Sequence, residues 1–121
     1  IMRVRLNILP DLNLGNLLQS TGKNAEAIYY YRKVTQYSPS DFNGYNKLSY
    51  TYYLLNDFEN SIAVNKRAAR FFPTLPDPLI NIGVAFQAIN KQDSAAVYLQ
   101  QALTIDPTNK AAQNLLEKNS K

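Results

Sequence analysis

The stretch PDPLINIGVAFQAINKQDSAAVYLQQALTIDPTN, residues 76–109, is one complete unit of a repeat that fills most of the chain. It ends near a proline, Pro107, and equivalent prolines precede it at Pro73 and Pro39, at equal intervals along the chain. Self-similarity at a fixed period of roughly 20–50 residues is the sequence signature of a repeat protein. The register of the prolines divides the chain into three units: 8–41, 42–75 and 76–109.

Each unit predicts two helices with a break between them, because its apolar residues recur at steps of three and four. The break falls at Gly22, Asn56 and Asn90, and glycine and asparagine tolerate the left-handed conformation in which helices commonly end. The proline closes the second helix because it lacks an N–H and clashes with a continuing helix. Asp77 is a predicted cap residue, followed by Pro78 at the first helical position.

Small residues at fixed places predict close packing of the two helices of a unit. Gly15 and Gly83 would let the first helix lie close to its partner. Tyr31 falls on a core position, and larger residues would fill the remaining space between the helices. These residues are Leu14, Leu18, Tyr52 and Phe86. A single hairpin cannot bury its apolar faces alone, so the units are expected to stack.

The composition limits the function classes that need to be considered. The chain has 121 residues and no cysteine or histidine, which excludes disulfides, thiolate nucleophiles, Ser-His-Asp triads and the usual zinc ligands. The net charge of +4 is scattered, so a nucleic-acid surface is not indicated. No apolar run reaches the roughly 20 residues that cross a bilayer, so no membrane insertion is expected from this segment. Cytoplasm and periplasm both fit this composition.

A nucleotide-binding loop is also excluded. Gly15 and Gly22 bring the stretch before Lys23 close to a phosphate-loop pattern, but six residues separate the glycines, where the pattern has four. Asn24 stands where a Ser or Thr would follow the lysine. No cofactor is therefore predicted, and no catalytic constellation either.

The repeat resembles the tetratricopeptide repeat (TPR) family, whose pattern is W-x2-L-G-x2-Y…A-x3-F…P within a unit of about 34 residues. The third unit matches it at Leu79, Ile82, Gly83, Phe86, Ala95, Leu99 and Pro107. The resemblance implies an all-α, right-handed solenoid of three helix-turn-helix hairpins in a domain at 10–121, closed by a capping helix at 110–121. Residues 1–9 are expected to be a linker or the remnant of a preceding element, with a divergent helix end or a strand as alternatives.

Two positions depart from the family pattern. Asp11 takes the place of a large apolar residue in the first unit, which suggests that the first helix has no full neighbour on that side, or a different one. Asn65 takes the place of the aromatic residue in the second unit, which predicts a looser spot in the second hairpin.

The resemblance also implies a function, because the first helices of TPR hairpins line a concave groove that receives a peptide or another protein segment. Amide side chains can pair with both the N–H and the C=O of an extended peptide, and aromatic side chains supply contact area at low entropic cost. The matching face here also carries Gln19, Ile80 and Gln87. The predicted peptide-binding residues are Leu12, Asn13, Asn16, Asn46, Lys47, Tyr50, Tyr53, Asn81 and Val84.

One family variant does not fit the sequence. Chaperone-binding members hold a C-terminal carboxylate with lysine, asparagine and arginine side chains from three units. Asn16 matches one of those positions, whereas Leu12, Lys47, Asp77 and Asn81 do not match the others. The sequence therefore does not predict a carboxylate clamp.

We predict a non-catalytic scaffold that binds a protein or an extended peptide and has no small-molecule substrate. The main alternative is a structural spacer or docking arm within a larger protein, which could be an enzyme or membrane-anchored. The apolar stretch at 71–79 is a candidate edge patch for such docking, with Phe71 expected to pack inward. A homo-oligomer formed through the first hairpin, near Asp11, is a third alternative.

Overall fold

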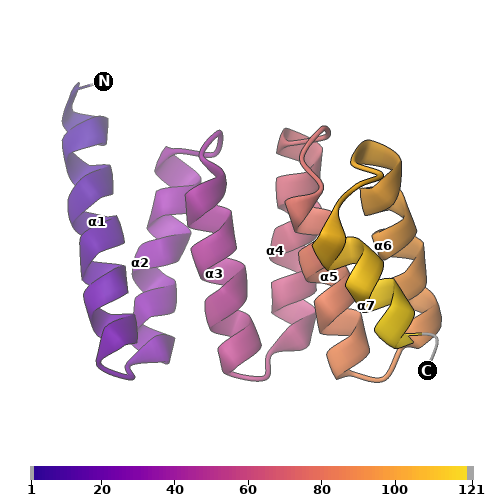
Figure 1. The fold of residues 1–121 in the computed structure, drawn as a ribbon. Coiled ribbons are helices and arrows are strands. Elements are labelled where there is room, and N and C mark those ends of the chain that lie inside the picture. Colours follow the sequence, from indigo (N-terminus) through magenta and orange to yellow (C-terminus); the bar gives the residue numbers. More distant parts are fainter. Residues whose placement is uncertain (1, 120–121) are drawn as a thin grey trace. The chain divides into compact units, whose positions relative to one another are not determined.

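The computed structural model describes the backbone of residues 2–119 and the side chains of residues 10–119. The described residues form seven helices and no strand, which confirms the all-α prediction (Figure 1). They fall into two compact units, which are not the three repeats of the sequence: the first compact unit ends at Asp57 and the second begins at Phe58. In the description of the structure, the first and second unit are these two compact units. The helices of the first unit are α1 (Met2–Ser20), α2 (Asn24–Tyr37) and α3 (Phe42–Leu54). Those of the second unit are α4 (Phe58–Phe71), α5 (Asp77–Ala88), α6 (Gln92–Ile105) and α7 (Lys110–Asn119).

The three predicted breaks are left-handed turns of one kind. Gly22 has φ +81°, and Asn56 and Asn90 each have φ +60°. In each turn the next residue donates its backbone N–H to a carbonyl five residues earlier, as Lys23 does to Leu18 at 2.8 Å. This closure satisfies carbonyls that the end of a helix leaves without partners. The prediction from glycine and asparagine is therefore confirmed.

The start of α5 differs by one residue from the prediction. Asp77 was expected to cap the helix, but it is the first helical residue, and Pro76 occupies the cap position without a side-chain hydrogen bond. The reason is the backbone of Pro76, whose φ of −72° and ψ of −19° are already helical. Its carbonyl accepts the N–H of Ile80 at 3.0 Å. Pro78 still lies in the first turn, where its missing N–H costs no intrahelical bond.

The amino-terminal residues continue α1. The sequence left 1–9 open between a linker, a helix end and a strand, and the backbone of residues 2–9 is helical and continuous with the rest of α1 (Figure 1). Pro10 lies inside this helix. Proline cannot donate the hydrogen bond that would reach back four residues, and inside a helix it usually costs about 3 kcal/mol.

In the first unit, glycines set how closely the helices pack. A Cβ atom on Gly15 would lie 2.7 Å from Cε1 of Tyr31, so α1 and α2 approach as closely as they do because that atom is absent. Gly44 of α3 packs against α2 in the same way, 2.9 Å from Cγ1 of Val34. Tyr31 and Val34 are both fully buried. The predicted roles of Gly15 and Tyr31 are confirmed.

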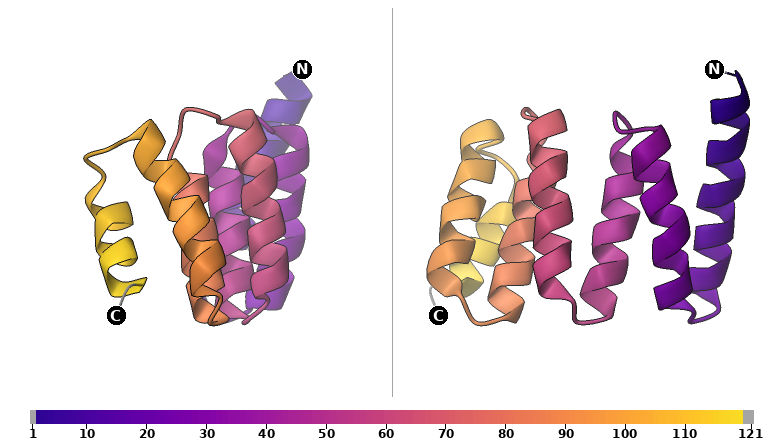
Figure 2. Two further views of the ribbon diagram at one scale, coloured as in Figure 1. Left: turned by 90° about the vertical axis from the view of Figure 1, so that its right-hand side faces the viewer. Right: turned by 180° about the vertical axis from the view of Figure 1, so that it is seen from behind.

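In the second unit, Gly83 of α5 faces Leu99 of α6, with a hypothetical Cβ atom 2.7 Å from Cγ of Leu99. The adjoining core is closed by α7, which lies against α5 and α6 (Figures 1 and 2). Ala112 of α7 is fully buried, and Leu115 and Leu116 pack on the cluster around Leu99. These contacts confirm the predicted capping helix.

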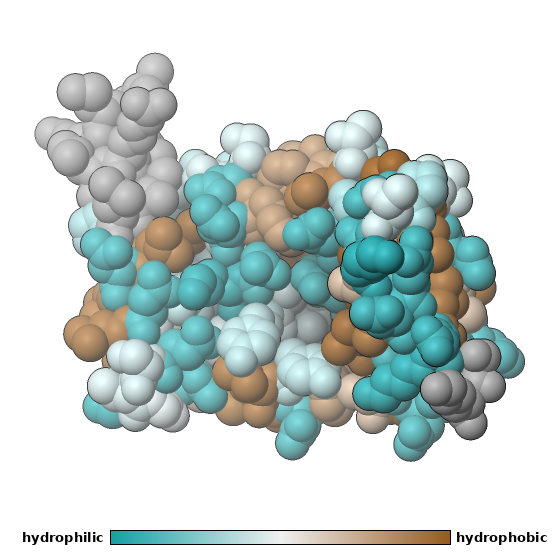
Figure 3. Space-filling model, in the orientation of Figure 1, coloured by the Kyte–Doolittle hydropathy of each residue, from teal (hydrophilic) through white to brown (hydrophobic). Residues whose placement is uncertain are grey.

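The outer face of α7 is hydrophilic where it is seen in Figure 3. Glu117 and Lys118 are exposed, as predicted. Lys121, which was expected to face water with them, lies outside the described residues. A polar outer face at the end of a stack of hairpins is what keeps such a stack soluble.

Two core predictions are wrong. Leu14 is 37% exposed, although Leu48 and Ile82, at the same repeat position, are 2% and 0% exposed. In the second unit Ile82 packs against Ile62 of α4, the helix that precedes α5. Phe71, expected to pack inward, is exposed at the end of α4.

Candidate functional site

The predicted face of the first unit combines side chains from α1 and α3. Asn13, Asn46 and Tyr50 are exposed, with about half of the Tyr50 side chain in contact with solvent (53%). The remaining predicted residues of this unit are half-buried: Leu12, Asn16, Lys47 and Tyr53. The face therefore presents amides, a cation and aromatic rings from two neighbouring first helices.

Gln19 joins the two helices of this face. Its Nε2 donates to Oγ1 of Thr51 on α3 over 2.6 Å. The Thr51 hydroxyl donates its own proton to the backbone carbonyl of Lys47 at 2.7 Å, so its oxygen acts as the acceptor for Gln19. Thr51 is fully buried, whereas Gln19 is half-buried.

Asn16 is tied to the core of the first hairpin. The hydroxyl of Tyr31 donates to Oδ1 of Asn16 over 2.6 Å. Burial raises the pKa of the Tyr31 hydroxyl, since the ionised form would lose its hydration. The hydroxyl therefore keeps its proton at neutral pH and needs an acceptor, which the Asn16 carbonyl oxygen provides.

In the second unit, Asn81 bonds to the residue that departs from the family pattern. Its Nδ2 donates to Oδ1 of Asn65 at 3.3 Å, and Nδ2 of Asn65 donates to the carbonyl of Ser61 at 3.0 Å. Asn65 is fully buried. Hydrogen bonds within α4 and to α5 thus hold the amide in the position where the pattern has an aromatic ring.

The other predicted residues of α5 differ in exposure. Val84 and Asn81 are half-buried. The sequence placed Ile80 on the same face, and this prediction is wrong. Ile80 belongs to the core cluster with Leu99 and Ala112. The capping helix explains the difference, since Ala112 and its neighbours on α7 pack on that cluster.

Gln87 connects α5 to the capping helix. Its Nε2 donates to the backbone carbonyl of Leu115 at 2.9 Å and to Oδ1 of Asn119 at 3.3 Å. Gln87 follows Gln19 by two whole repeat lengths, so the two glutamines occupy the same repeat position. Each one reaches the first helix of the following unit of the repeat.

Asp11, the other departure from the pattern, forms an ion pair. Its carboxylate lies 3.6 Å from Nζ of Lys33 on α2. The same Nζ lies 5.3 Å from the centre of the Tyr29 ring. The apolar contact expected at this position is thus replaced by a pairing of charges within the first hairpin.

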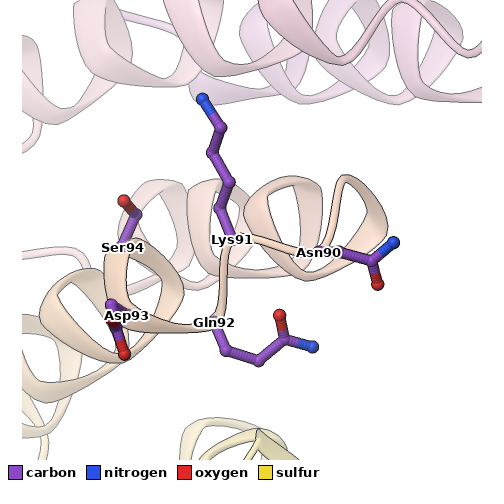
Figure 4. Close-up of a pocket in the computed structure, with 5 residues that line it drawn as sticks. All are labelled: Asn90, Lys91, Gln92, Asp93 and Ser94. Carbon is purple, nitrogen blue, oxygen red and sulfur yellow. The ribbon is translucent and has the colours of Figure 1, made fainter.

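Metal sites and membrane spans are absent from the described residues. No group of three or more His, Cys, Asp or Glu side chains there could hold a metal ion. No helix of the described part is long and apolar enough to cross a membrane. An open depression at the turn between α5 and α6 is lined by five consecutive side chains, which point in different directions and not toward a common centre (Figure 4). They are Asn90, Lys91, Gln92, Asp93 and Ser94.

Sequence reasoning missed the residues that hold the amides in place. Thr51 and Tyr31 were not recognised as hydrogen-bond partners of the face, because periodicity identifies buried positions without showing which polar atom a buried residue presents. One signal was available for Gln19 and Gln87: the same residue type recurs at one repeat position, two units apart.

Comparison with known proteins agrees with this architecture. A family model described as tetratricopeptide repeat matches residues 12–41 and 76–109. No curated protein sequence matches the chain.

Solved structures with the same fold include three TPR domains. The first TPR domain of Spaghetti (RPAP3) is 24% identical, with a TM-score of 0.80, covering 95% of this chain and 91% of that one. The second TPR domain of human RPAP3 is 19% identical, with a TM-score of 0.84 and 98% of each chain covered. The TPR domain of Arabidopsis OM64 is 15% identical, with a TM-score of 0.82 and 97% of each chain covered.

Proposed function

Because the chain belongs to the tetratricopeptide repeat family, we propose that it is a non-catalytic module that binds a protein or peptide segment through the first helices of its hairpins. The observation that carries this proposal is the face of α1 and α3. Asn16 and Gln19 turn one end of each amide toward the protein and leave the other end for a ligand. The exposed Tyr50 ring adds apolar contact area beside them.

The solved relatives support binding of peptides by this fold. The first TPR domain of Spaghetti is bound to the HSP90 peptide SRMEEVD, and the second TPR domain of human RPAP3 is in complex with the HSP70 peptide SGPTIEEVD. The chain differs from the carboxylate-holding pattern at Leu12, Lys47, Asp77 and Asn81. We therefore propose an extended segment as the ligand, and not a C-terminal carboxylate.

Selection from a random peptide library displayed on phage tests this function. The expected result is a set of peptides whose affinity falls in Asn13→Ala, Tyr50→Ala and Asn81→Ala. Matched controls are Tyr29→Ala, an exposed tyrosine of α2, and Gln101→Ala, an exposed amide of α6. Binding that the controls weaken as much as the three face variants would place the ligand elsewhere, and a library without binders would refute the function.

A second candidate function is self-association through the exposed apolar side of α1, which carries Leu14 and Leu17. Leu17 is 60% exposed, whereas Thr51 and Ala85, at the same repeat position, are both 0% exposed. Together with the exposed Leu14, it forms an apolar stripe one turn long. Two copies of α1 running antiparallel would place Leu14 of each against Leu17 of the other.

Sedimentation over a range of concentrations tests this candidate. The expected result is a reversible dimer that Leu17→Lys weakens. Val97→Lys is the matched control, because Val97 is 54% exposed and its counterparts Tyr29 and Ala63 are exposed as well. A monomer at every concentration would exclude self-association.

A further inference from the structure

The outward-facing end of the Asn16 amide is a hydrogen-bond donor. Its Oδ1 is occupied by the Tyr31 hydroxyl, and no other hydrogen bond of Asn16 occurs within the described part of the chain. Turning the amide over would leave the buried Tyr31 proton without an acceptor, and an unsatisfied buried donor is costly. The NH2 group of this half-buried side chain is therefore left to bond with water or a ligand.

The outward-facing end of the Gln19 amide is, in contrast, an acceptor. The Thr51 hydroxyl gives its proton to the Lys47 carbonyl and so can only accept from Gln19. This fixes Nε2 toward α3 and leaves Oε1, which makes no hydrogen bond among residues 10–119. The two amides thus have opposite polarity, and each polarity is imposed by a buried hydroxyl.

Gln87, in the third repeat, shows the same arrangement within the second compact unit. Its Nε2 is held by the Leu115 carbonyl and by Oδ1 of Asn119, both acceptors on α7, so its Oε1 likewise makes no hydrogen bond among residues 10–119. The two glutamines are fixed by different groups, a threonine hydroxyl in one unit and a backbone carbonyl in the other. The orientation of the amide is the feature that the two units share.

We propose that Asn16 and Gln19 read the main chain of an extended peptide, Asn16 donating to a backbone C=O and Gln19 accepting from a backbone N–H, with Tyr31 and Thr51 as positioning residues. This inference rests on the proposed peptide-binding function and specifies its ligand class. Gln87 is the corresponding acceptor in the second unit.

The spacing on α1 fits such a ligand. Residues three apart on a helix have Cβ atoms about 5–6 Å apart. In an extended chain, the N–H and C=O groups on one edge recur every two residues, or about 7 Å. The two spacings are therefore of the same order. Because both contacts are neutral and use only the backbone, the ligand's sequence matters little at these two points, and salt weakens them little.

A backbone scan of one selected peptide tests the proposal. The probe is the tightest-binding nonapeptide from the phage library, synthesised with each amide in turn replaced by an ester, which removes one N–H. One ester is expected to weaken binding about fivefold to tenfold, as the loss of one hydrogen bond does. The same ester should have no further effect on binding by Gln19→Ala. Equal binding of every ester peptide would overturn the role of Gln19.

Two variants of the positioning residues extend the test. Tyr31→Phe keeps the ring beside Gly15 and removes the hydroxyl, and Thr51→Val removes the hydroxyl beside Gln19 at almost the same volume. Each is expected to weaken binding of the selected peptide severalfold, while circular dichroism shows a folded chain. The matched controls are Tyr30→Phe on the same helix and Thr104→Val, whose hydroxyl bonds to the Gln100 carbonyl on an exposed face.

A double-mutant cycle separates positioning from general structure. If Tyr31 acts through Asn16, then Tyr31→Phe loses its effect on binding in an Asn16→Ala background. An undiminished effect there would overturn the positioning role. Asn16→Asp still accepts from Tyr31 but turns a negatively charged oxygen toward the peptide C=O in place of a donor, so it should bind the peptide more weakly than Asn16→Ala. A library without binders would instead refute the proposed function, and this inference with it.

Discussion

The first and third hairpins solve the same packing problem with different side chains. Gly15 and Gly83 occupy one repeat position, and each leaves space for a large residue of the partner helix. Tyr31 fills that space in the first hairpin and Leu99 fills it in the third. Both are fully buried, but only tyrosine has a polar atom at its far end, and that atom reaches Asn16.

This difference shows how a core residue can determine a surface property. At the repeat position of Asn16, the third hairpin has Val84, which needs no polar partner. In the second unit the corresponding core position holds Asn65, which bonds to Asn81 of the following helix. The partners of Asn16 and Asn81 therefore depend on which residue stands at this core position of the second helix.

The largest effect is expected from emptying the space that each glycine leaves. Tyr31→Ala should lower the free energy of unfolding by about 3–5 kcal/mol and Leu99→Ala by about 2–5 kcal/mol, as truncation of buried aromatic and aliphatic residues does. Urea denaturation checks both. If either loss were under about 1 kcal/mol, that hairpin would not depend on the contact.

Filling the space from the other side should cost less. Gly15→Ala and Gly83→Ala each place a Cβ atom 2.7 Å from the facing side chain, so we expect each to lower stability by about 1–3 kcal/mol through overpacking. Alanine is otherwise the better helix former by about 1 kcal/mol. An increase in the thermal midpoint of either variant would show that the facing residue moves aside without cost.

The Asn65–Asn81 bond should be visible as a coupling. Asn65→Ala is expected to lower stability by about 1–2 kcal/mol, because it removes a buried hydrogen bond. In an Asn81→Ala background the loss should be smaller by about 0.5–1 kcal/mol. Strictly additive losses in urea denaturation would contradict a bond between the two amides.

Tyr31→Phe should cost about 1 kcal/mol at neutral pH, the usual contribution of one hydrogen bond. The cost should depend on pH. Burial raises the pKa of Tyr31 above its unfolded value of about 10, so the neutral hydroxyl stabilises the folded chain below that pH and the stabilisation is lost as pH rises through the folded pKa. Denaturation of both chains between pH 7 and 11 checks whether their difference shrinks.

The smallest effect is expected at exposed apolar positions. Leu17→Lys and Val97→Lys should each change the stability of the monomer by less than about 0.5 kcal/mol, since neither side chain is buried. Thermal unfolding at low concentration is the measurement. A large loss for Leu17→Lys alone would mean that α1 is covered in solution.

Much of the fold could be predicted because similar residue types recur at the same position of each repeat. The left-handed turns at Gly22, Asn56 and Asn90, the contact of Gly15 with Tyr31 and the capping helix all follow from residue type and register. The exposure of Leu14 could not, because register assigns the same burial to equivalent positions of every unit, whereas Leu14 is exposed and Leu48 and Ile82 are buried.

The predicted peptide-binding residues remain a prediction, and the structure adds to it the direction of their amides. Neither the partner of Asn16 nor that of Gln19 can be read from the sequence, since each depends on which atom of a buried hydroxyl is already in use. Asn65 illustrates the same limit. Its residue type indicated a departure from the pattern, but only the arrangement of α4 and α5 reveals that Asn81 satisfies it.

The three left-handed turns have a consequence for how the length of such a chain can change. Each turn has the same backbone conformation and the same closing hydrogen bond, so the chain enters and leaves it in the same way at residues 22, 56 and 90. Duplicating or deleting one whole repeat between two of these turns creates no new junction geometry. Such a chain can therefore lengthen by duplication of the DNA that encodes one repeat. The structural requirement is that the added repeat packs against the repeats beside it.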